Sequence, residues 1–129
     1  MNQIIHQPED KFFKQSLSDI RVAKDFFEEH LPPAILNQLD LNSLKLQNQT
    51  FIDEAYKNTE ADIVYKANFN QQSGFIYTLL EHQSKTDHYM ALRLLSYCLR
   101  IIEQHRKQNP KKPLPIVYSG SVENQRLSN

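Results

Sequence analysis

The chain has 129 residues, of which 40% are hydrophobic and 23% charged, and its 15 basic and 15 acidic residues cancel to a net charge of zero. This length and composition fit one globular domain with a single core and exclude a disordered chain. The neutral total excludes a protein that coats nucleic acid through bulk positive charge, although it permits a local basic face beside an acidic site.

Rare residues and apolar runs narrow the class of protein further. The single cysteine, Cys98, excludes an internal disulfide and a CxxC metal site, and two glycines are too few for a glycine-rich phosphate loop. The first residues show no secretory signal, and no run approaches the roughly 18 apolar residues of a membrane-spanning helix. We therefore expect a cytoplasmic protein with no membrane partner.

The N-terminal part of the sequence predicts a helix. Over residues 9–30, apolar side chains recur at spacings typical of one face of an amphipathic helix, at Phe13, Leu17, Ile20 and Phe27. Pro32 and Pro33 end this helix, because proline cannot continue helical hydrogen bonding. A short helical turn is expected over residues 34–39.

The middle of the sequence changes to an extended pattern. Residues 43–47 alternate apolar and polar side chains, which predicts a strand, and residues 50–52 resume it after a turn signal. Two runs rich in β-forming residues, 61–69 and 75–81, are joined by a polar stretch over residues 70–74, which predicts an antiparallel hairpin with a five-residue loop. The second run is apolar on both faces, which favours a central strand.

The C-terminal part predicts a second helix and a last strand. The helix covers residues 87–107, with a buried stripe formed by Ala91, Leu94, Leu95, Cys98, Ile101 and Ile102. A short strand is expected over residues 114–118, followed by a poorly ordered polar tail over 119–129. We therefore expect a single domain over residues 1–129, with its core over 8–118 and the element order helix-strand-strand-strand-helix-strand.

Two acidic residues form the constellation with the clearest chemistry. Asp62 lies near the start of the first hairpin strand and Glu81 at the end of the second, so the hairpin permits them to be neighbours, with Gln83 on the same face as Glu81. Adjacent carboxylates at the end of an apolar sheet are costly unless a cation joins them, and Mg²⁺ prefers oxygen ligands of this kind. The backbone carbonyl of His82 is a further candidate ligand, and Mn²⁺ is an expected substitute for Mg²⁺. Gln83 can orient water or a phosphate oxygen but supplies no positive charge.

The spacing of Asp62 and Glu81 in the sequence does not distinguish a metal site from two ordinary surface carboxylates. An acidic residue at a strand start and another at a strand end are common surface features, and from spacing alone that interpretation is favoured. Longer sequence strings are therefore needed to decide between the two.

Several such strings resemble the recombination-promoting nuclease (Rpn) family, whose members are also described as transposases. Pro8-Glu-Asp-Lys-Phe-Phe-Lys14 is similar to the opening motif of that family, and Leu79-Leu-Glu-His-Gln-Ser84 is similar to its sharpest signature. Shorter matching strings complete the series in the same order, at residues 51–54, 61–65, 92–97 and 115–118. The resemblance implies the PD-(D/E)XK nuclease fold, an α/β restriction-endonuclease-like core with a mixed sheet.

The resemblance also implies roles for individual residues. It makes Asp62 and Glu81 metal ligands and Gln83 the third active-site residue of a Mg²⁺-dependent DNA endonuclease, which acts in recombination or in the movement of mobile elements. Asp10 and Asp53 fall on matching positions; Asp10 is expected to support the metal site, and for Asp53 a structural role at a strand end is an equal alternative. DNA is the implied partner.

The sequence departs from the family in ways that leave a second function open. Glu9 replaces a histidine of the opening motif, Gln83 replaces the lysine of PD-(D/E)XK enzymes, and Ser119-Gly120 stands where the family has His-Gly. Family members also continue beyond this point. The alternative is a truncated, catalytically inactive nuclease fold that serves as a DNA-binding or dimerisation module, and a homodimer is expected.

Four basic side chains are candidates for contact with DNA phosphates. Arg93 and Arg100 lie on one face of the predicted second helix, and arginine suits phosphate geometry. Lys85 shares strand parity with Glu81, and Lys66 shares it with Asp62, so either lysine is a substitute for the missing one. A solvated surface explains the arginines equally well and is the better interpretation of the lysines.

Overall fold

In the computed structural model of the chain, residues 11–52, 60–82 and 89–124 are described. Residues 11–18 are helical, and the elements that follow are α2 (Ile20–His30), α3 (Pro33–Leu36), β1 (Leu39–Gln47), β2 (Glu60–Phe69), β3 (Gln72–His82), α4 (Met90–Gln108) and β4 (Ile116–Asn124). This order confirms the predicted succession of helix, three strands, helix and strand, and the mixed α/β class.

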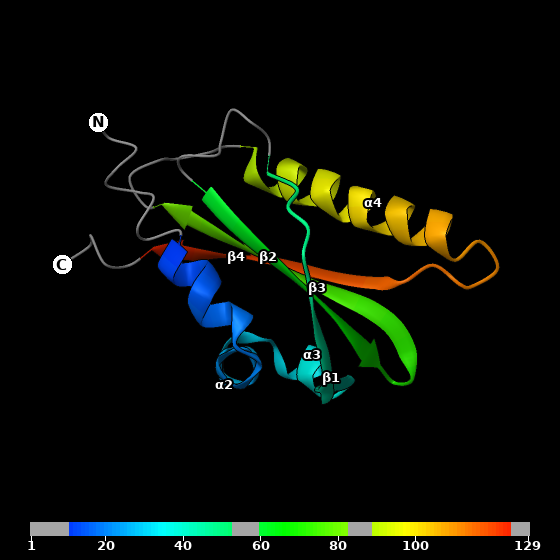
Figure 1. Ribbon diagram of the computed structural model, residues 1–129, viewed down its shortest axis with the longest axis horizontal. Coiled ribbons are helices and arrows are strands. Elements are labelled where there is room, and N and C mark those ends of the chain that lie inside the picture. The colour runs from blue at the N-terminus through cyan, green and yellow to red at the C-terminus, as the bar shows by residue number, and fades with distance from the viewer. Residues whose placement is uncertain (1–10, 53–59, 83–88, 125–129) are drawn as a thin grey trace.

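The four strands form one mixed sheet in the order β1-β2-β3-β4. β1, β2 and β3 are antiparallel neighbours, whereas β4 returns parallel to β3. A parallel return needs a crossover connection, and α4 provides it. Figure 1 shows α2 and α4 on opposite faces of the sheet, so the domain has three layers.

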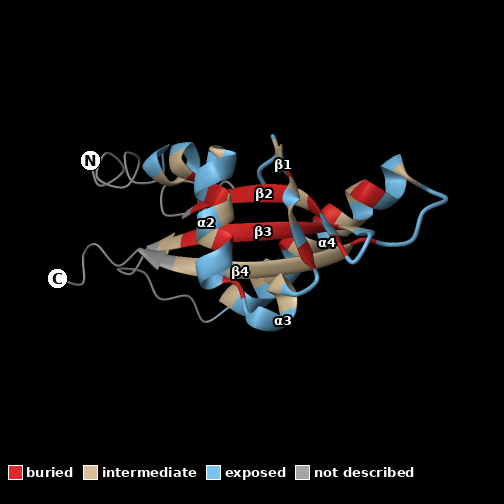
Figure 2. Cartoon of the chain, turned by 90° about the horizontal axis from the view of Figure 1, so that it is seen from below, coloured by how far each residue is buried: buried red, intermediate tan, exposed pale blue. Residues whose placement is uncertain are grey.

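β2 and β3 are buried on both faces, because successive side chains along a strand point to opposite sides. The side chains that face α2 pack around Phe27 and comprise Ile63, Tyr65, Ala67, Phe69 and Ile76. The side chains that face α4 pack with Tyr97 and Ile101 and comprise Val64, Phe75, Tyr77 and Leu79. Figure 2 shows these buried residues running along both strands. The continuous apolar run of β3 therefore belongs to a central strand, as predicted.

The single helix predicted over residues 9–30 is wrong, because the chain bends at Asp19. Asp19 has an extended backbone (φ −80°, ψ 118°), and its carboxylate accepts a hydrogen bond from the backbone nitrogen of Arg21 at 2.9 Å. The Arg21 guanidinium also bonds to this carboxylate, and these hydrogen bonds lower the pKa of Asp19. An aspartate that caps a helix N-terminus competes with continuation of the preceding helix, so α2 begins anew at Ile20.

A side-chain hydrogen bond from Tyr65 of β2 holds the helix of residues 11–18 against the sheet. The Tyr65 side chain is fully buried, and its hydroxyl donates a hydrogen bond to the backbone carbonyl of Leu17 at 2.5 Å. Burial raises the pKa of Tyr65 to about 12, so the hydroxyl remains a donor at neutral pH. This contact positions the helix that carries Lys14.

The predicted five-residue hairpin loop is also wrong, because β2 and β3 are joined by a turn of two residues, Asn70 and Gln71. Both have positive φ, 50° and 68°, as a tight hairpin turn requires. Gly74, expected in the loop, instead pairs with Ala67 inside the ladder. A Cβ atom at Gly74 would lie 2.4 Å from Cδ1 of Phe69, so this position needs glycine for close packing.

The predicted bounds of the outer strands are wrong in both cases. β1 begins at Leu39, before the predicted residue 43, and residues 50–52 do not continue it as a strand. β4 runs to Asn124, so residues 119–124, expected in the tail, pair with β3. These polar residues are ordered by main-chain hydrogen bonds to the central strand β3. Such bonds form between backbone groups and do not require hydrophobic side chains.

The buried stripe predicted for the second helix is only partly correct. Ile101 is buried, but Ala91 and Leu95 are exposed, and Tyr97 and His105 are buried in their place. These buried residues recur every fourth position, which is the face of α4 that packs on the sheet. None of the described helices is long and apolar enough to cross a membrane.

Candidate active site

Asp62 is a buried carboxylate in the third position of β2, and its side chain has no solvent exposure. It pairs with Leu79 of β3, and both belong to the set of residues that faces α4. β1 pairs with β2 only as far as Gln47 opposite Val64, so the outer edge of β2 beside Asp62 is not covered by β1. The segment that follows β1 lies there instead.

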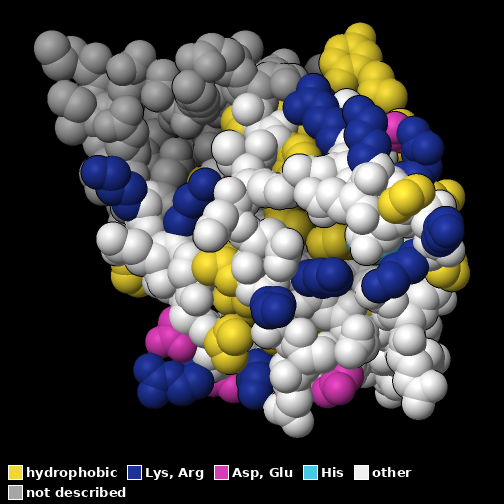
Figure 3. Space-filling view, turned by 45° about the vertical axis from the view of Figure 1, so that its right-hand side comes forward, with side chains coloured by type: hydrophobic (Ala, Val, Ile, Leu, Met, Phe, Trp, Pro, Cys, Tyr) yellow, Lys and Arg dark blue, Asp and Glu magenta, His cyan; other side chains and the backbone are white. Residues whose placement is uncertain are grey.

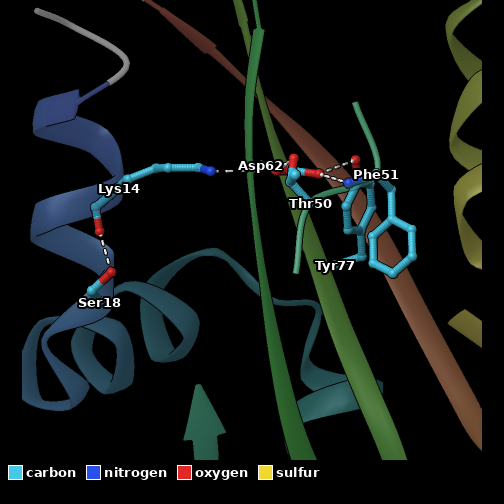
Figure 4. A network of polar contacts seen from close by, with 6 residues as sticks. All are labelled: Lys14, Ser18, Thr50, Phe51, Asp62 and Tyr77. Atoms are coloured by element: carbon cyan, nitrogen blue, oxygen red, sulfur yellow. Dashed lines mark hydrogen bonds and ion pairs between the residues drawn. The ribbon is translucent and has the colours of Figure 1, made fainter. Parts of the chain in front are cut away.

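Three hydrogen bonds hold the Asp62 carboxylate (Figure 4). Oδ2 accepts from the backbone nitrogen of Phe51 at 2.7 Å and from the hydroxyl of Tyr77 at 3.1 Å. Oδ1 accepts from the hydroxyl of Thr50 at 2.7 Å. Because a buried charge is costly unless it is paired and hydrogen-bonded, these donors explain how β2 tolerates the carboxylate.

Lys14 brings a positive charge to the same carboxylate. Its ammonium nitrogen lies 3.7 Å from Oδ1 of Asp62, and its side chain is 45% exposed. Figure 4 shows it reaching toward Asp62 from the helix of residues 11–18. The two residues line an open cavity of about 290 Å³, together with Ser18, Leu46, Gln47, Asn48, Gln49, Thr50 and Ile63.

Glu81 lies on the same face of the sheet as Asp62 but not directly opposite it. Its register partner is Glu60, two residues before Asp62, so the two predicted ligands occupy diagonal positions on adjacent strands. Diagonal neighbours of an antiparallel pair are roughly 7–8 Å apart, a distance that long side chains can span. Glu81 is half-buried. It does not line the cavity beside Lys14.

The structure places the two candidate arginines on α4. Arg100 donates a hydrogen bond from Nη1 to the backbone carbonyl of Phe51 at 3.1 Å, and its guanidinium lies 5.3 Å from the centroid of the Tyr97 ring. Phe51 therefore contacts Arg100 through its carbonyl and Asp62 through its N–H, and this links α4 to the buried carboxylate. Arg93 is half-buried.

Several predicted site residues lie outside the described part of the chain. These are Asp10, Asp53, Gln83 and Lys85. His82 ends β3, and its backbone pairs with Asn124. Lys66 is described, but it lies four residues beyond Asp62 along β2, and its charge acts on His105 of α4.

Sequence reasoning missed four residues that contact Asp62: Lys14, Thr50, Phe51 and Tyr77. Lys14 and Phe51 lie within the matching strings, which was the only signal available. No spacing rule connects Lys14, Thr50 and Phe51 to Asp62, because these contacts arise when separate elements pack together, whereas the hairpin register places Tyr77 diagonal to Asp62.

The carboxylate oxygens of the candidate site are suitable ligands for a hard divalent cation. The two carboxylates supply the oxygen ligands that Mg²⁺ prefers, and Oδ1 of Asp62 accepts a single hydrogen bond among the described contacts, so it has capacity for one more partner. Within the described residues, no group of three or more His, Cys, Asp or Glu side chains gathers. A metal would therefore need backbone carbonyls and water to complete its coordination.

Fold and site together define an α/β domain with a mixed sheet whose central hairpin carries Asp62 and Glu81 on one face. The family profile described as "Putative transposase, YhgA-like" matches residues 7–120. The chain therefore belongs to that family, and the resemblance found in the sequence strings is confirmed.

Two of its relatives are named recombination-promoting nucleases. RpnD of Escherichia coli O157:H7 is 37% identical over 110 residues, which cover 85% of this chain and 42% of RpnD. RpnC of Escherichia coli K12 is 36% identical over 110 residues, covering 85% of this chain and 36% of RpnC. The chain thus spans well under half the length of these two relatives. No solved structure gives a significant match.

One further relative is short. The protein named "Putative inactive recombination-promoting nuclease-like protein YjiP", from Escherichia coli K12, is 38% identical over 95 residues, which cover 74% of this chain and 92% of that protein. The family therefore includes proteins named as nucleases and proteins named as inactive.

Proposed function

We propose that this protein is a metal-dependent DNA endonuclease of the recombination-promoting type, with a restriction-endonuclease-like core. The observation that carries the proposal is the buried, hydrogen-bonded carboxylate of Asp62 on the same sheet face as Glu81. A fold rarely keeps an aspartate at 1% exposure among apolar neighbours without a functional or structural demand. The relatives named as nucleases support the functional interpretation.

Asp62 and Glu81 would hold Mg²⁺ or Mn²⁺, with the backbone carbonyl of His82 as a further ligand. When bound, the metal supplies an activated water and offsets the charge of the phosphodiester. The N–H of Phe51 and the hydroxyl of Tyr77 fix Oδ2 of Asp62, whereas Oδ1 accepts one described hydrogen bond, from Thr50, and would take the metal as its further partner. Gln83 would orient water or a phosphate oxygen, and Arg93 and Lys85 would contact phosphates along the DNA.

Arg100 has a different role in this proposal from the one expected for it. Because it bonds to the carbonyl of Phe51, it positions the segment that holds Asp62. A contact with DNA phosphate would be additional to this bond, since a guanidinium has five donors in total. The main role proposed for Arg100 is therefore to position the segment that holds Asp62, and a contact with DNA phosphate is an additional role.

A nicking assay tests the proposal. We expect purified protein to nick supercoiled plasmid DNA with Mg²⁺ or Mn²⁺ and to stop when EDTA is added. Asp62→Asn keeps the shape of the side chain but removes its charge, and it should reduce the rate by about 100-fold or more. Asp25→Asn, the same change at an exposed position on α2, is the matched control and should cut normally. Cutting that survives Asp62→Asn, or that does not need a metal, contradicts the proposal.

A second candidate is a module that binds DNA or dimerises without cutting it. It is favoured by the match to a relative named as inactive over 92% of that relative's length. Titration calorimetry with Mn²⁺ distinguishes the two functions, because a catalytic site takes up Mn²⁺ through Asp62 and Glu81 and an inert module does not. Sedimentation velocity over a range of protein concentrations tests whether a homodimer forms.

A further inference from the structure

The cavity beside Asp62 holds a lysine that no strand-based motif assigns to the site. The Lys14 ammonium reaches Asp62 from the helix of residues 11–18, across the edge of β2 that β1 leaves uncovered. The Asp62 side chain is fully buried, whereas the Lys14 side chain is 45% exposed. One partner therefore belongs to the core, and the other lies between the core and the cavity.

The Asp62 carboxylate does not depend on Lys14 for its hydrogen bonds. Three other donors bond to it at 2.7–3.1 Å, whereas the Lys14 nitrogen stands at 3.7 Å, which is an ion pair and not a hydrogen bond. Among the described residues, Asp62 is the only acidic partner within ion-pair distance of Lys14. An ammonium has three donors, so Lys14 keeps hydrogen-bonding capacity for an anion that enters the cavity.

From this geometry we infer that Lys14 is the cationic residue of the site and contacts the phosphate of the nucleic acid beside Asp62. The inference rests on the proposed function. A lysine is a compact positive charge that stabilises charge developing on a phosphate oxygen. Gln83 cannot supply that charge, and Lys66 lies four residues further along β2, near His105. Lys14 therefore fills the role from a different element.

A phosphate contact by Lys14 predicts effects on metal and DNA affinity that a purely structural ion pair does not. A divalent cation on Asp62 and the ammonium of Lys14 are like charges at close range, so they oppose each other until an anion joins them. Removal of the Lys14 charge should therefore strengthen metal binding in the absence of DNA and weaken DNA binding. A lysine that only supports the fold would change both affinities in the same direction, through loss of structure.

The experiment compares Lys14→Gln with two other variants. Lys14→Arg keeps the charge, and Lys11→Gln removes an exposed charge from the same helix, for which no ion pair occurs among the described residues. Mn²⁺ affinity is measured by calorimetry without DNA. DNA affinity is measured by fluorescence anisotropy of a labelled duplex in Ca²⁺, and cutting by the plasmid assay with Mg²⁺.

For Lys14→Gln we expect Mn²⁺ to bind about 2–10-fold more tightly, DNA to bind roughly 5–10-fold more weakly, and cutting to slow by about 100-fold. Lys14→Arg should keep DNA affinity within about twofold of the wild-type value, and Lys11→Gln should change each readout by less than about twofold. Circular dichroism melting curves establish that the variants are folded.

The outcomes separate this inference from the proposed function. Wild-type cutting that Lys14→Gln leaves unchanged overturns the role of Lys14 and leaves the endonuclease standing. A joint fall in Mn²⁺ affinity, DNA affinity and melting temperature also overturns it, because Lys14 is then structural. If the wild-type protein does not cut DNA, the proposed function fails, and the two binding measurements alone decide the role of Lys14.

Discussion

At the scale of single residues, the carboxylate of Asp62 is the feature around which the site is organised. Its donors come from the segment after β1 and from β3, and its ion-pair partner comes from the first helix. Because the charge is buried, each donor contributes to stability as well as to position. Removal of one hydrogen-bond donor to Asp62 should therefore lower the free energy of unfolding, whether or not it also changes the activity.

Tyr77→Phe tests this coupling. The change removes one hydrogen bond to a buried charged group, so we expect it to lower the free energy of unfolding by about 1.5–3 kcal/mol. In an Asp62→Ala background the same change should cost much less, because the acceptor is gone. Urea denaturation of the four proteins in this double-mutant cycle measures the difference. Tyr118→Phe, at a half-buried position with no described hydroxyl hydrogen bond, is the control. Equal costs in both backgrounds would show that the bond to Asp62 contributes nothing.

The residues of the site differ in how far the sequence could predict them. Asp62 and Glu81 are recognisable because they stand within family strings at the start and end of hairpin strands. Thr50, Phe51 and Tyr77 lie 12, 11 and 15 residues from Asp62 along the chain. Thr50 and Phe51 meet it only after the segment beyond β1 folds against β2, whereas Tyr77 meets it from the adjacent strand β3. Local pattern does not encode such contacts, so they become visible only in the folded chain.

At the scale of elements, α4 carries a buried histidine that makes stability depend on pH. His105 is 5% exposed, its ring lies 5.7 Å from that of Phe75 in an edge-to-face arrangement, and its Nδ1 has no hydrogen-bond partner among the described residues. Burial lowers the pKa of His105, and the nearby charges of Lys66 and Lys112 lower it further. The folded protein therefore keeps this ring neutral.

The sign of the pH dependence follows from that shift. The unfolded chain binds a proton at His105 near the ordinary value of 6.5, whereas the folded chain binds it only at lower pH. The contribution of His105 to stability is therefore complete above pH 6.5 and is lost as the pH falls below it. We expect His105→Leu to unfold less steeply with acid than the wild-type protein, as measured by urea denaturation between about pH 7.5 and 5. Identical pH profiles for both proteins would contradict the burial argument.

The elements themselves follow the sequence where hydrophobic pattern dominates and depart from it where backbone geometry decides. Alternation and apolar runs predicted β2 and β3 well, because those strands form the core. The hairpin turn was mispredicted because Asn70 and Gln71 adopt positive φ without a glycine to signal it. The polar end of β4 was missed because its order comes from parallel pairing with β3, which a periodicity argument cannot detect.

At the scale of the whole molecule, the net charge is zero, but the charged side chains are unevenly distributed over the surface. Basic and acidic residues number 15 each, yet Figure 3 shows a face on which Lys and Arg side chains gather and few acidic side chains are visible among the described residues. α4 adds to this asymmetry, since its last turn carries Arg106 and Lys107. Such a distribution attracts a phosphate backbone locally without a long-range positive field.

Under the proposed function, DNA binding should depend on salt only modestly. Each phosphate neutralised by a lysine or arginine adds about −0.9 to the slope of log Kobs against log salt concentration, and a contact area limited to one face predicts a total slope of roughly −2 to −4. Anisotropy titrations of a labelled duplex in Ca²⁺ between about 50 and 200 mM salt give this slope. Lys14→Gln should make it shallower by about 0.9, because one phosphate contact is lost, and Lys11→Gln should leave it unchanged. A slope steeper than about −6 would contradict this prediction, because DNA would then be held by many dispersed charges and not by the face shown in Figure 3 alone.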